Sequence, residues 1–541
     1  MTLREKVAQL VIVPFYGEPP NSRSREYTQF VRLVRDTGVG GMVLLNRVPQ
    51  GVVRRAEPYA VAAFTNRMQR LAKIPLLVAG DFERGPSMRV EGAAPFPHAM
   101  ALGAAGDPAL SSYMGEVTAR EARALGIHWL LAPVADVNNN PDNPVINIRS
   151  FGENPADVAA HVKAFLEGAR ADARYPVLTT VKHFPGHGDT AVDTHLNLAS
   201  VGADRARLDS VELVPFKAAI AQGVDAVMTA HIAVPALDGP DVPATVSPIL
   251  HTLLRGGLGF KGLVVTDALE MGGIAKDFKS GEAAVRALEA GADVLLMPPD
   301  PLAAINAVVA AVVEGRLPRG RIEQSLEKIL AAKERLGLRR RRLVDVESVA
   351  DAVGDPDSLE SAQAISDRSV TLVRNEDNVL PLTGGDACFA MLQENPRSPA
   401  GQSVVEELRK RAPQAVIVTV GSAIGGAALT EATDRLSGCN RVVVFSFSAS
   451  GVLPEPMRLF VEAVPESKAV ILVSLGSPYL LRAFPKAKAF LTTCSNVRPA
   501  EVSVVRALFG EIDTGGRLPV TIPGFAAHGE GISLPAARRV P

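Results

Sequence analysis

The sequence predicts an α/β protein in which an N-terminal (β/α)8 barrel is followed by a smaller α/β domain. Three observations lead to this prediction: the length, the alternation of short apolar runs with helical stretches, and polar residues at the ends of those runs. With 541 residues, the chain is longer than one hydrophobic core usually serves. Hydrophobic residues make up 47% and charged residues 21%, which are ordinary globular proportions and exclude a disordered chain.

Eight apolar runs of strand character recur before residue 300, and helical periodicity follows them. Such strands, alternating with helices, indicate a parallel sheet covered on both faces. The runs are 10–15, 40–45, 75–81, 129–137, 177–184, 225–232, 262–269 and 292–297, and helices are expected over 112–125, 155–171 and 209–223. Eight strand–helix units fit a (β/α)8 barrel, although a doubly wound open sheet shows the same alternation.

The polar residues favour the barrel over the open sheet. They lie at or just beyond the C-terminal ends of five predicted strands: Asp81, Asp136, Lys182 with His183, His231 and Asp267. In a barrel these ends converge on one face, where active sites are built. We therefore expect a single pocket formed by these strands.

A polar stretch with little strand signal, residues 339–358, follows the last helical segment of the predicted barrel. We interpret it as a linker between a barrel over 1–338 and a second domain over 359–541. In the second domain, apolar runs alternate with helical stretches, which predicts a smaller α/β sheet domain. The runs are 370–375, 415–420, 441–447, 469–476 and 489–494, and the helical stretches include 403–412 and 499–510.

Charge and cysteine content narrow the class of protein. The 57 basic and 58 acidic residues nearly cancel, so no bulk field attracts nucleic acid or an anionic membrane. The three cysteines, Cys388, Cys439 and Cys494, are too few for a disulfide framework, and we expect them to be buried as small hydrophobic residues. No signal peptide or membrane-spanning run is evident, so we expect a cytoplasmic protein, or an exported one if a leader precedes this sequence.

The segment from Lys182 to His195, KHFPGHGDTAVDTH, carries the most chemistry, and we call it the histidine loop. Asp193 can approach the imidazole of His195 two residues later, which gives a proton-transfer dyad. A loop histidine usually makes only local hydrogen bonds, but three histidines, a lysine and two aspartates within this segment favour catalysis. A zinc or iron site on His183, His187, Asp193 and His195 is the alternative, although the spacing of a metal-binding helix is missing.

Three other strand ends add acids, amides and cations. Asp267 ends an apolar strand, where a buried carboxylate is costly unless a Lys or Arg pairs with it, so a structural ion pair is the alternative to a functional role. Asp81 is followed by Arg89, and the polar loop 138–152 contains Arg149. This mixture suits a polyhydroxylated ligand. Motifs for nucleotide phosphates and for a serine nucleophile are missing from the sequence, so neither a cofactor nor a metal is expected.

With these motifs the chain resembles glycoside hydrolase family 3, in its β-N-acetylglucosaminidase branch. The resemblance rests on the histidine loop, on 132–152, on VMTAHI (227–232) and on VVTDALEM (264–271), while 507–523 resembles the closing motif of the family's α/β sandwich domain. It implies that Asp267 is the nucleophile and His195 the acid/base, with Asp193 as its partner. It also implies that the terminal sugar is held by Asp81, Arg89, Arg149, Lys182 and His183, with His231 in a pocket strand. The family's common DQEGG motif reads here as Asp81-Phe-Glu-Arg-Gly, so Phe82 and Arg84 depart from the pattern.

The resemblance implies retaining hydrolysis of terminal GlcNAc from cell-wall peptidoglycan fragments or related glycosides. Histidine as a residue type titrates near pH 6.5, so it can give and take a proton close to neutrality. It also repels an incoming anion less than a carboxylate does, which leaves phosphorolysis open beside hydrolysis. The same residues also fit a β-glucosidase, a metal-dependent hydrolase or a sugar-binding protein without catalysis.

Overall fold

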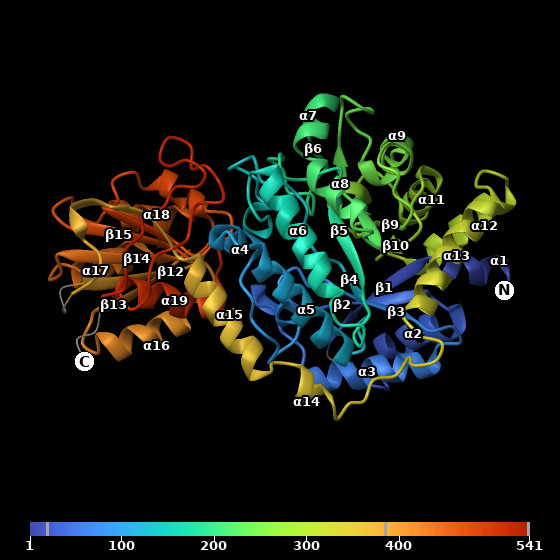
Figure 1. Ribbon diagram of the computed structural model, residues 1–541, viewed down its shortest axis with the longest axis horizontal. Helices are drawn as coiled ribbons and strands as arrows, with labels where there is room; N and C mark the ends of the chain where they lie inside the picture. The colour runs from blue at the N-terminus through green and yellow to red at the C-terminus, as the bar shows by residue number, and fades with distance from the viewer. Residues whose placement is uncertain (18–20, 384–386, 538–541) are drawn as a thin grey trace.

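Two α/β domains make up the computed structural model, whose described residues are 1–17, 21–383 and 387–537 (Figure 1). The barrel runs from blue to yellow-green, and the second domain is orange and red. Among the described residues, no helix combines the length and the apolar character needed to cross a membrane.

The first domain is a parallel barrel, as predicted. Within the described residues its eight strands follow the order β10-β1-β2-β3-β4-β5-β7-β9, and a parallel bridge between Val265 and Val294 joins β9 to the start of β10. This closure excludes the doubly wound open sheet. The strands are β1 (Val11–Tyr16), β2 (Gly41–Leu45), β3 (Leu77–Gly80), β4 (Trp129–Leu130), β5 (Leu178–Phe184), β7 (Ala226–Thr229), β9 (Leu263–Thr266) and β10 (Leu295–Leu296).

Helices surround the barrel (Figure 1). They are α1 (Leu3–Ala8), α2 (Arg25–Arg32), α3 (Pro58–Leu71), α4 (Ala99–Ala105), α5 (Pro108–Ala124), α6 (Pro155–Ala169), α7 (Arg205–Ser210), α8 (Val214–Ala221), α9 (Pro248–Thr252), α10 (Gly272–Ala275), α11 (Ser280–Ala290), α12 (Pro301–Val313) and α13 (Arg319–Arg335). The helices predicted over 112–125 and 155–171 correspond to α5 and α6. The helix predicted over 209–223 is divided between α7 and α8, because Pro215 has no backbone N–H and fits only the first turn of a helix.

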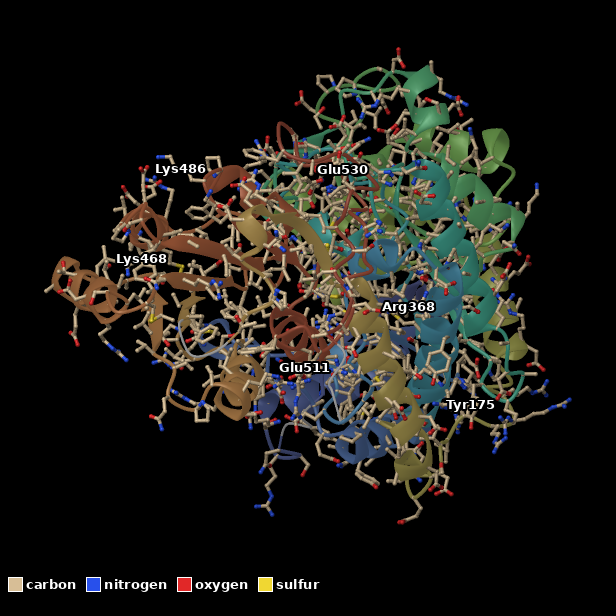
Figure 2. The ribbon with its side chains drawn as sticks, turned by 60° about the vertical axis from the view of Figure 1, so that its left-hand side comes forward. Tyr175, Arg368, Lys468, Lys486, Glu511 and Glu530 are labelled. Carbon is tan, nitrogen blue, oxygen red and sulfur yellow. A yellow bond between two sulfur atoms is a disulfide. The ribbon has the colours of Figure 1, made fainter. Side chains whose placement is uncertain are left out.

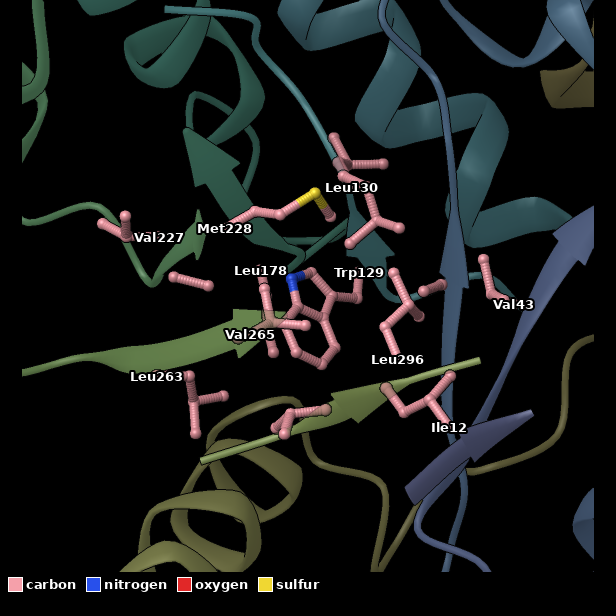
Figure 3. Packing of buried hydrophobic residues seen from close by; sticks show 14 of the residues in the cluster. Ile12, Val43, Trp129, Leu130, Leu178, Val227, Met228, Leu263, Val265 and Leu296 are labelled. Atoms are coloured by element: carbon pink, nitrogen blue, oxygen red, sulfur yellow. The ribbon is translucent and has the colours of Figure 1, made fainter. Parts of the chain in front are cut away.

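Apolar side chains fill the barrel interior (Figure 3). Trp129 is completely buried at its centre, and its Nε1–H donates a hydrogen bond of 2.6 Å to Thr180 Oγ1. Ile12, Val43 and Leu296 lie around it, so the barrel is a packed core rather than a channel. The strand predicted over 129–137 is shorter than expected because Pro133 cannot donate to a β-ladder.

The second domain contains a mixed sheet with helices on both faces. In the described part of the chain its strand order is β11-β16-β15-β14-β12-β13, and only β11 is antiparallel to its neighbour. The strands are β11 (Thr371–Asn375), β12 (Ala387–Gln393), β13 (Ile417–Gly421), β14 (Arg441–Ser446), β15 (Ala469–Ser474) and β16 (Ala489–Thr492), and the helices are α16 (Gln402–Arg411), α17 (Gly426–Arg435), α18 (Glu455–Glu462) and α19 (Arg498–Leu508). Alternate residues of β12 and β14 enter two separate apolar clusters, which makes this domain the α/β sandwich that the resemblance implies.

The cysteine prediction is wrong for two of the three residues. Cys388 and Cys439 form a disulfide, whereas Cys494 is a free, buried thiol as expected. Cys388 lies on β12, a strand missing from the sequence prediction, and it pairs in register with Val442 of β14. That pairing brings Cys439, three residues before Val442, next to Cys388.

Two helices connect the domains, α14 (Val349–Ala352) and α15 (Pro356–Ser369). The predicted linker 339–358 thus contains α14 and the first residues of α15, and the exact domain boundaries stay a prediction. α15 packs against α4 of the barrel and α19 of the second domain. Arg368 of α15, labelled in Figure 2, forms an ion pair of 3.0 Å with Asp107 at the start of α5.

Candidate active site

A cavity of about 240 Å³ lies at the C-terminal ends of the barrel strands. Its lining includes most of the residues that the sequence predicts for the site: Asp81, Arg89, Arg149, Lys182, His183, His195 and Asp267. These residues come from segments separated by up to almost two hundred positions in the chain. The prediction that the strand ends form one pocket is therefore confirmed for this set.

A network of ion pairs forms one wall of the cavity. Lys182 Nζ lies 2.5 Å from Asp81 Oδ1 and 2.8 Å from Glu83 Oε1, and Arg89 Nη2 lies 2.9 Å from Asp81 Oδ2. Arg149 binds both oxygens of Glu83, at 2.7 and 2.9 Å. Burial raises the pKa of Glu83, but the charges of Arg149 and Lys182 outweigh it and hold this pKa well below its usual value. The wall is therefore fixed and ionised.

Glu83 is a site residue that the sequence prediction missed. It lies two residues after Asp81, so its position in the same loop was visible, but its two cationic partners lie far downstream in the chain. A buried carboxylate between two cations costs little and positions both of them. Glu83 thus orients Arg149 and Lys182.

Asp136 holds the histidine loop at its start. Its Oδ2 accepts a hydrogen bond from His183 Nδ1 at 2.7 Å, and its Oδ1 accepts from the backbone N–H groups of His183 (3.1 Å) and His187 (2.7 Å). Because a carboxylate only accepts, Nδ1 of His183 carries the proton. Nε2 of His183 then faces Arg149 Nη2, 3.4 Å away, as an acceptor. Asp136 is among the strand-end residues of the sequence analysis but not among its site residues.

Asp267 follows β9 directly and lines the cavity. Its Oδ1 accepts a hydrogen bond of 2.8 Å from the backbone N–H of Ala268. Burial raises its pKa, but His183, His231 and the Ala268 N–H together lower it below the usual aspartate value. Among the described residues no Lys or Arg forms an ion pair with Asp267, so the structure gives no support to a structural ion pair at this position.

The dyad predicted from the sequence is present in the histidine loop. Asp193 Oδ1 lies 2.8 Å from His195 Nδ1 and also accepts the backbone N–H of His195 at 2.8 Å. The carboxylate thus fixes the proton on Nδ1 and leaves Nε2 for proton transfer. The His195 side chain is 59% exposed, so it stands at the mouth of the cavity rather than in its floor.

Two glycines hold the end of the histidine loop against the barrel. The backbone N–H groups of Gly272 and Gly273 donate hydrogen bonds of 3.0 Å to the carbonyl oxygens of His195 and Thr194. A Cβ on Gly272 would lie 2.4 Å from the carbonyl oxygen of Leu196. The close approach of the loop therefore requires glycine at position 272.

The structure gives His187 and His231 internal partners. Both ring nitrogens of His187 form hydrogen bonds of 2.9 Å with threonine hydroxyls of the loop. His231 donates from Nε2 to the Ala268 carbonyl at 3.0 Å and accepts at Nδ1 from Thr245, 2.9 Å away. His231 thus lies outside the cavity lining and supports the segment that carries Asp267. In the described residues no group of three His, Cys, Asp or Glu side chains is arranged to hold a metal ion.

Comparisons with known proteins agree with this architecture. The sequence pattern described as "Glycosyl hydrolase family 3 N terminal domain" matches residues 2–332. A β-N-acetylglucosaminidase/β-glucosidase of Cellulomonas fimi is 31% identical over 544 residues, which cover 95% of this chain and 93% of that protein. The solved structure of a family 3 β-N-acetylglucosaminidase from Paenibacillus sp. str. FPU-7 has a TM-score of 0.86 and 35% identity, over 96% of this chain and 99% of that one.

The β-glucoside phosphorylase BglX has a TM-score of 0.84 at 22% identity, over 97% of this chain and 95% of that one, a likeness that shows the fold alone. The family pattern covers more than half of the chain, and the Cellulomonas relative aligns along nearly all of it. The resemblance inferred from the sequence motifs is thereby confirmed. The chain is a glycoside hydrolase and belongs to glycosyl hydrolase family 3.

Proposed function

We propose that the protein is a retaining exo-β-N-acetylglucosaminidase. The observation that carries this proposal is the pairing of two groups at one cavity: Asp267, a carboxylate without a cationic partner among the described residues, and His195, whose Nδ1 is held by Asp193. The fixed ionic wall opposite offers carboxylates and cations to sugar hydroxyls, which both donate and accept hydrogen bonds. The names of the Cellulomonas and Paenibacillus relatives support N-acetylglucosamine as the terminal sugar.

The reaction takes two steps. Asp267 attacks the anomeric carbon, the glycosidic bond breaks, and Nε2 of His195 gives its proton to the departing oxygen. Neutral His195 then removes a proton from water, whose oxygen attacks the anomeric carbon and releases Asp267 as a carboxylate. Two inversions restore the β configuration. The lowered pKa of Asp267 keeps the nucleophile ionised at neutral pH.

The first test is replacement of the nucleophile. Asp267→Ala is expected to abolish nitrophenol release from 4-nitrophenyl β-N-acetylglucosaminide, while Asp241→Asn, which changes an exposed acid outside the cavity, keeps wild-type turnover. A 2-fluoro sugar is expected to label Asp267 covalently, as mass spectrometry of the peptide would show. Unchanged turnover in Asp267→Ala would reject the assignment, and an oxazoline product without an adduct would favour the substrate-assisted route.

The natural substrate in this proposal is a GlcNAc-terminated peptidoglycan fragment. The support is the resemblance of the histidine loop to the family's β-N-acetylglucosaminidase branch. A panel of β-GlcNAc, β-GalNAc and β-glucose nitrophenyl glycosides separates this specificity from that of a β-glucosidase. Faster turnover of the glucoside than of the β-GlcNAc glycoside would reject it.

Phosphorolysis is the second candidate, and the specific observation in its favour is the acid/base itself. His195 carries no negative charge when neutral, so it repels an anionic acceptor less than a carboxylate would. Adding phosphate to the assay is expected to leave free GlcNAc as the product of a hydrolase. Accumulation of GlcNAc 1-phosphate would identify a phosphorylase instead.

The Cys388–Cys439 disulfide bears on the location of the protein. Disulfides persist in oxidising compartments and are rare in the cytosol. We therefore propose an exported protein rather than a cytoplasmic one. Alkylation of free thiols in fractionated cells, followed by mass spectrometry, tests this: recovery of the protein in the cytosolic fraction with both cysteines alkylated would reject it.

A further inference from the structure

A second cavity, of about 310 Å³, adjoins the sugar cavity. The two share Asp81, Arg89, Arg149 and His195 in their linings, so they meet at the wall next to the histidine loop. Under the proposed function His195 protonates the departing oxygen. The space beside His195, away from Asp267, is therefore where the leaving group or the incoming acceptor lies.

The second cavity has one cation more than its acids neutralise. Arg149 is paired with Glu83, and Arg89 with Asp81. Arg84, which also lines this cavity, forms no ion pair with any described residue, and its Nε–H is buried without a hydrogen-bond partner. A buried donor without an acceptor is rare in folded proteins and costs free energy.

Neighbouring groups add to this positive character. Nε of Arg89 is also buried and has no hydrogen-bond partner. Burial, together with the nearby positive charges of Arg55 and Arg89, lowers the pKa of Arg84 to about 10, so the guanidinium is still charged at neutral pH. Burial likewise lowers the pKa of His98 in the same cavity to about 3, so this histidine is neutral, and its Nδ1 lies 2.9 Å from Ser495 Oγ of the second domain.

We propose that Arg84 makes the second cavity a binding site for an anionic oxygen group on the leaving-group side of the sugar. The inference rests on the proposed function and names the substrate class of that site. Two sources fit the chemistry: a carboxylate on the aglycone, and a free phosphate acceptor. Guanidinium groups bind both through paired N–H donors. Arg84 is also where this chain departs from the glycine of the family's common motif, so the site is a feature of this chain.

The phosphate source implies a balanced second step. An unprotonated oxygen of HPO₄²⁻ attacks the anomeric carbon of the glycosyl-enzyme, the ester bond to Asp267 breaks, and Asp267 leaves as a carboxylate. The product is the sugar 1-phosphate, and no further reactant is needed. The carboxylate source requires no covalent step beyond those of the proposed hydrolysis.

The first arm of the experiment compares two disaccharides, N,N′-diacetylchitobiose and GlcNAc-β-1,4-MurNAc, whose reducing sugars differ by a lactyl group that carries a carboxylate. In Arg84→Gln, the ratio of kcat/KM for the anionic disaccharide to that for the neutral one is expected to fall about tenfold. Arg84→Lys is expected to recover part of the ratio, and Arg340→Gln, which removes an exposed charge outside the cavity, serves as the matched control. Arg84→Gly, the residue of the family motif, replaces the glutamine variant if that variant does not fold.

The second arm adds phosphate to the chitobiose reaction and measures the sugar 1-phosphate. A phosphate-dependent rate that falls about tenfold in Arg84→Gln assigns the site to the acceptor, and a change in the disaccharide ratio alone assigns it to the aglycone. If neither quantity changes, the proposal is overturned. Calorimetry with Asp267→Asn measures binding of the same two disaccharides without turnover, so wild-type protein that binds but cleaves neither would reject the proposed hydrolysis separately from the anion site.

Discussion

Replacing Asp136 by asparagine tests whether the buried carboxylate sets the tautomer of His183. The shape of the side chain is conserved, and an amide oxygen in place of Oδ1 still accepts both backbone N–H groups of the loop. The amide nitrogen then faces His183 Nδ1, where it donates instead of accepting. The proton of His183 must therefore move to Nε2, which faces Arg149 Nη2 at 3.4 Å.

The cost of Asp136→Asn follows from these contacts. The lost charge-assisted hydrogen bond at 2.7 Å is worth about 1.5–3 kcal/mol, and the new donor facing the donor of Arg149 adds about 1 kcal/mol. The sum of roughly 2.5–4 kcal/mol corresponds to a loss of roughly 10² to 10³ in kcat/KM, if it falls on the bound sugar. Burial raises the pKa of Asp136, but His183 and His187 outweigh it and lower this pKa, so the wild-type group is ionised at neutral pH.

The assay compares kcat/KM for 4-nitrophenyl β-N-acetylglucosaminide in wild type, Asp136→Asn, His183→Ala and the double variant. If Asp136 acts through His183, the asparagine substitution adds little to His183→Ala. Nitrogen-15 shifts of the imidazole report the change of tautomer, and thermal unfolding shows whether the variant is folded. A value of kcat/KM within threefold of wild type, or fully additive effects, would refute this reasoning.

Three further variants probe other parts of the structure. Gly272→Ala forces the end of the histidine loop away and is expected to lower kcat about 100-fold, whereas Gly256→Ala, with open space around its Cβ, is expected to lower it less than twofold; equal kcat values would contradict this. Replacing both Cys388 and Cys439 by alanine is expected to lower the free energy of unfolding of the second domain by about 4 kcal/mol, since the disulfide spans 51 residues, and a change below 1 kcal/mol in urea unfolding would speak against a disulfide. Because the pKa of Glu83 is lowered on folding, its contribution to stability is complete above its ordinary value of about 4.5 and is lost as the pH falls below it, so the melting temperature of Glu83→Gln is expected to depend less on pH between 3 and 5 than that of wild type; parallel curves would disprove it.

The barrel could be predicted from the sequence because each of its strands is buried on both faces and appears as a continuous apolar run. The strand β12 was missed for the opposite reason. It contains no Val, Ile or Thr, the β-branched residues typical of strands, and only its neighbours in the sheet identify it. The missed disulfide follows from the same gap, because Cys388 lies on this strand.

The site was predictable where one strand end carries the chemistry and not where two distant segments combine. Asp267 and His195 were found because each lies in a distinctive local motif. The role of Glu83 depends on Lys182 and Arg149, which are 99 and 66 positions away in the sequence. The internal position of His231 likewise depends on hydrogen bonds that no local pattern reveals.

The second domain contributes to the site through the loop that carries Arg149. Glu153, just after this loop, accepts hydrogen bonds of 2.7 and 2.6 Å from the backbone N–H and the hydroxyl of Thr521, and Asn138 at its start donates to the hydroxyl of Tyr479 at 3.1 Å. Both ends of the loop are therefore held by the second domain, while its arginine is bound by Glu83 of the barrel. Because a misplacement of about 1 Å is enough to cost catalysis about a hundredfold, a loop this long needs such fixed ends. The second domain, which adds no acid or histidine to the sugar cavity lining, thus acts on the reaction by positioning Arg149.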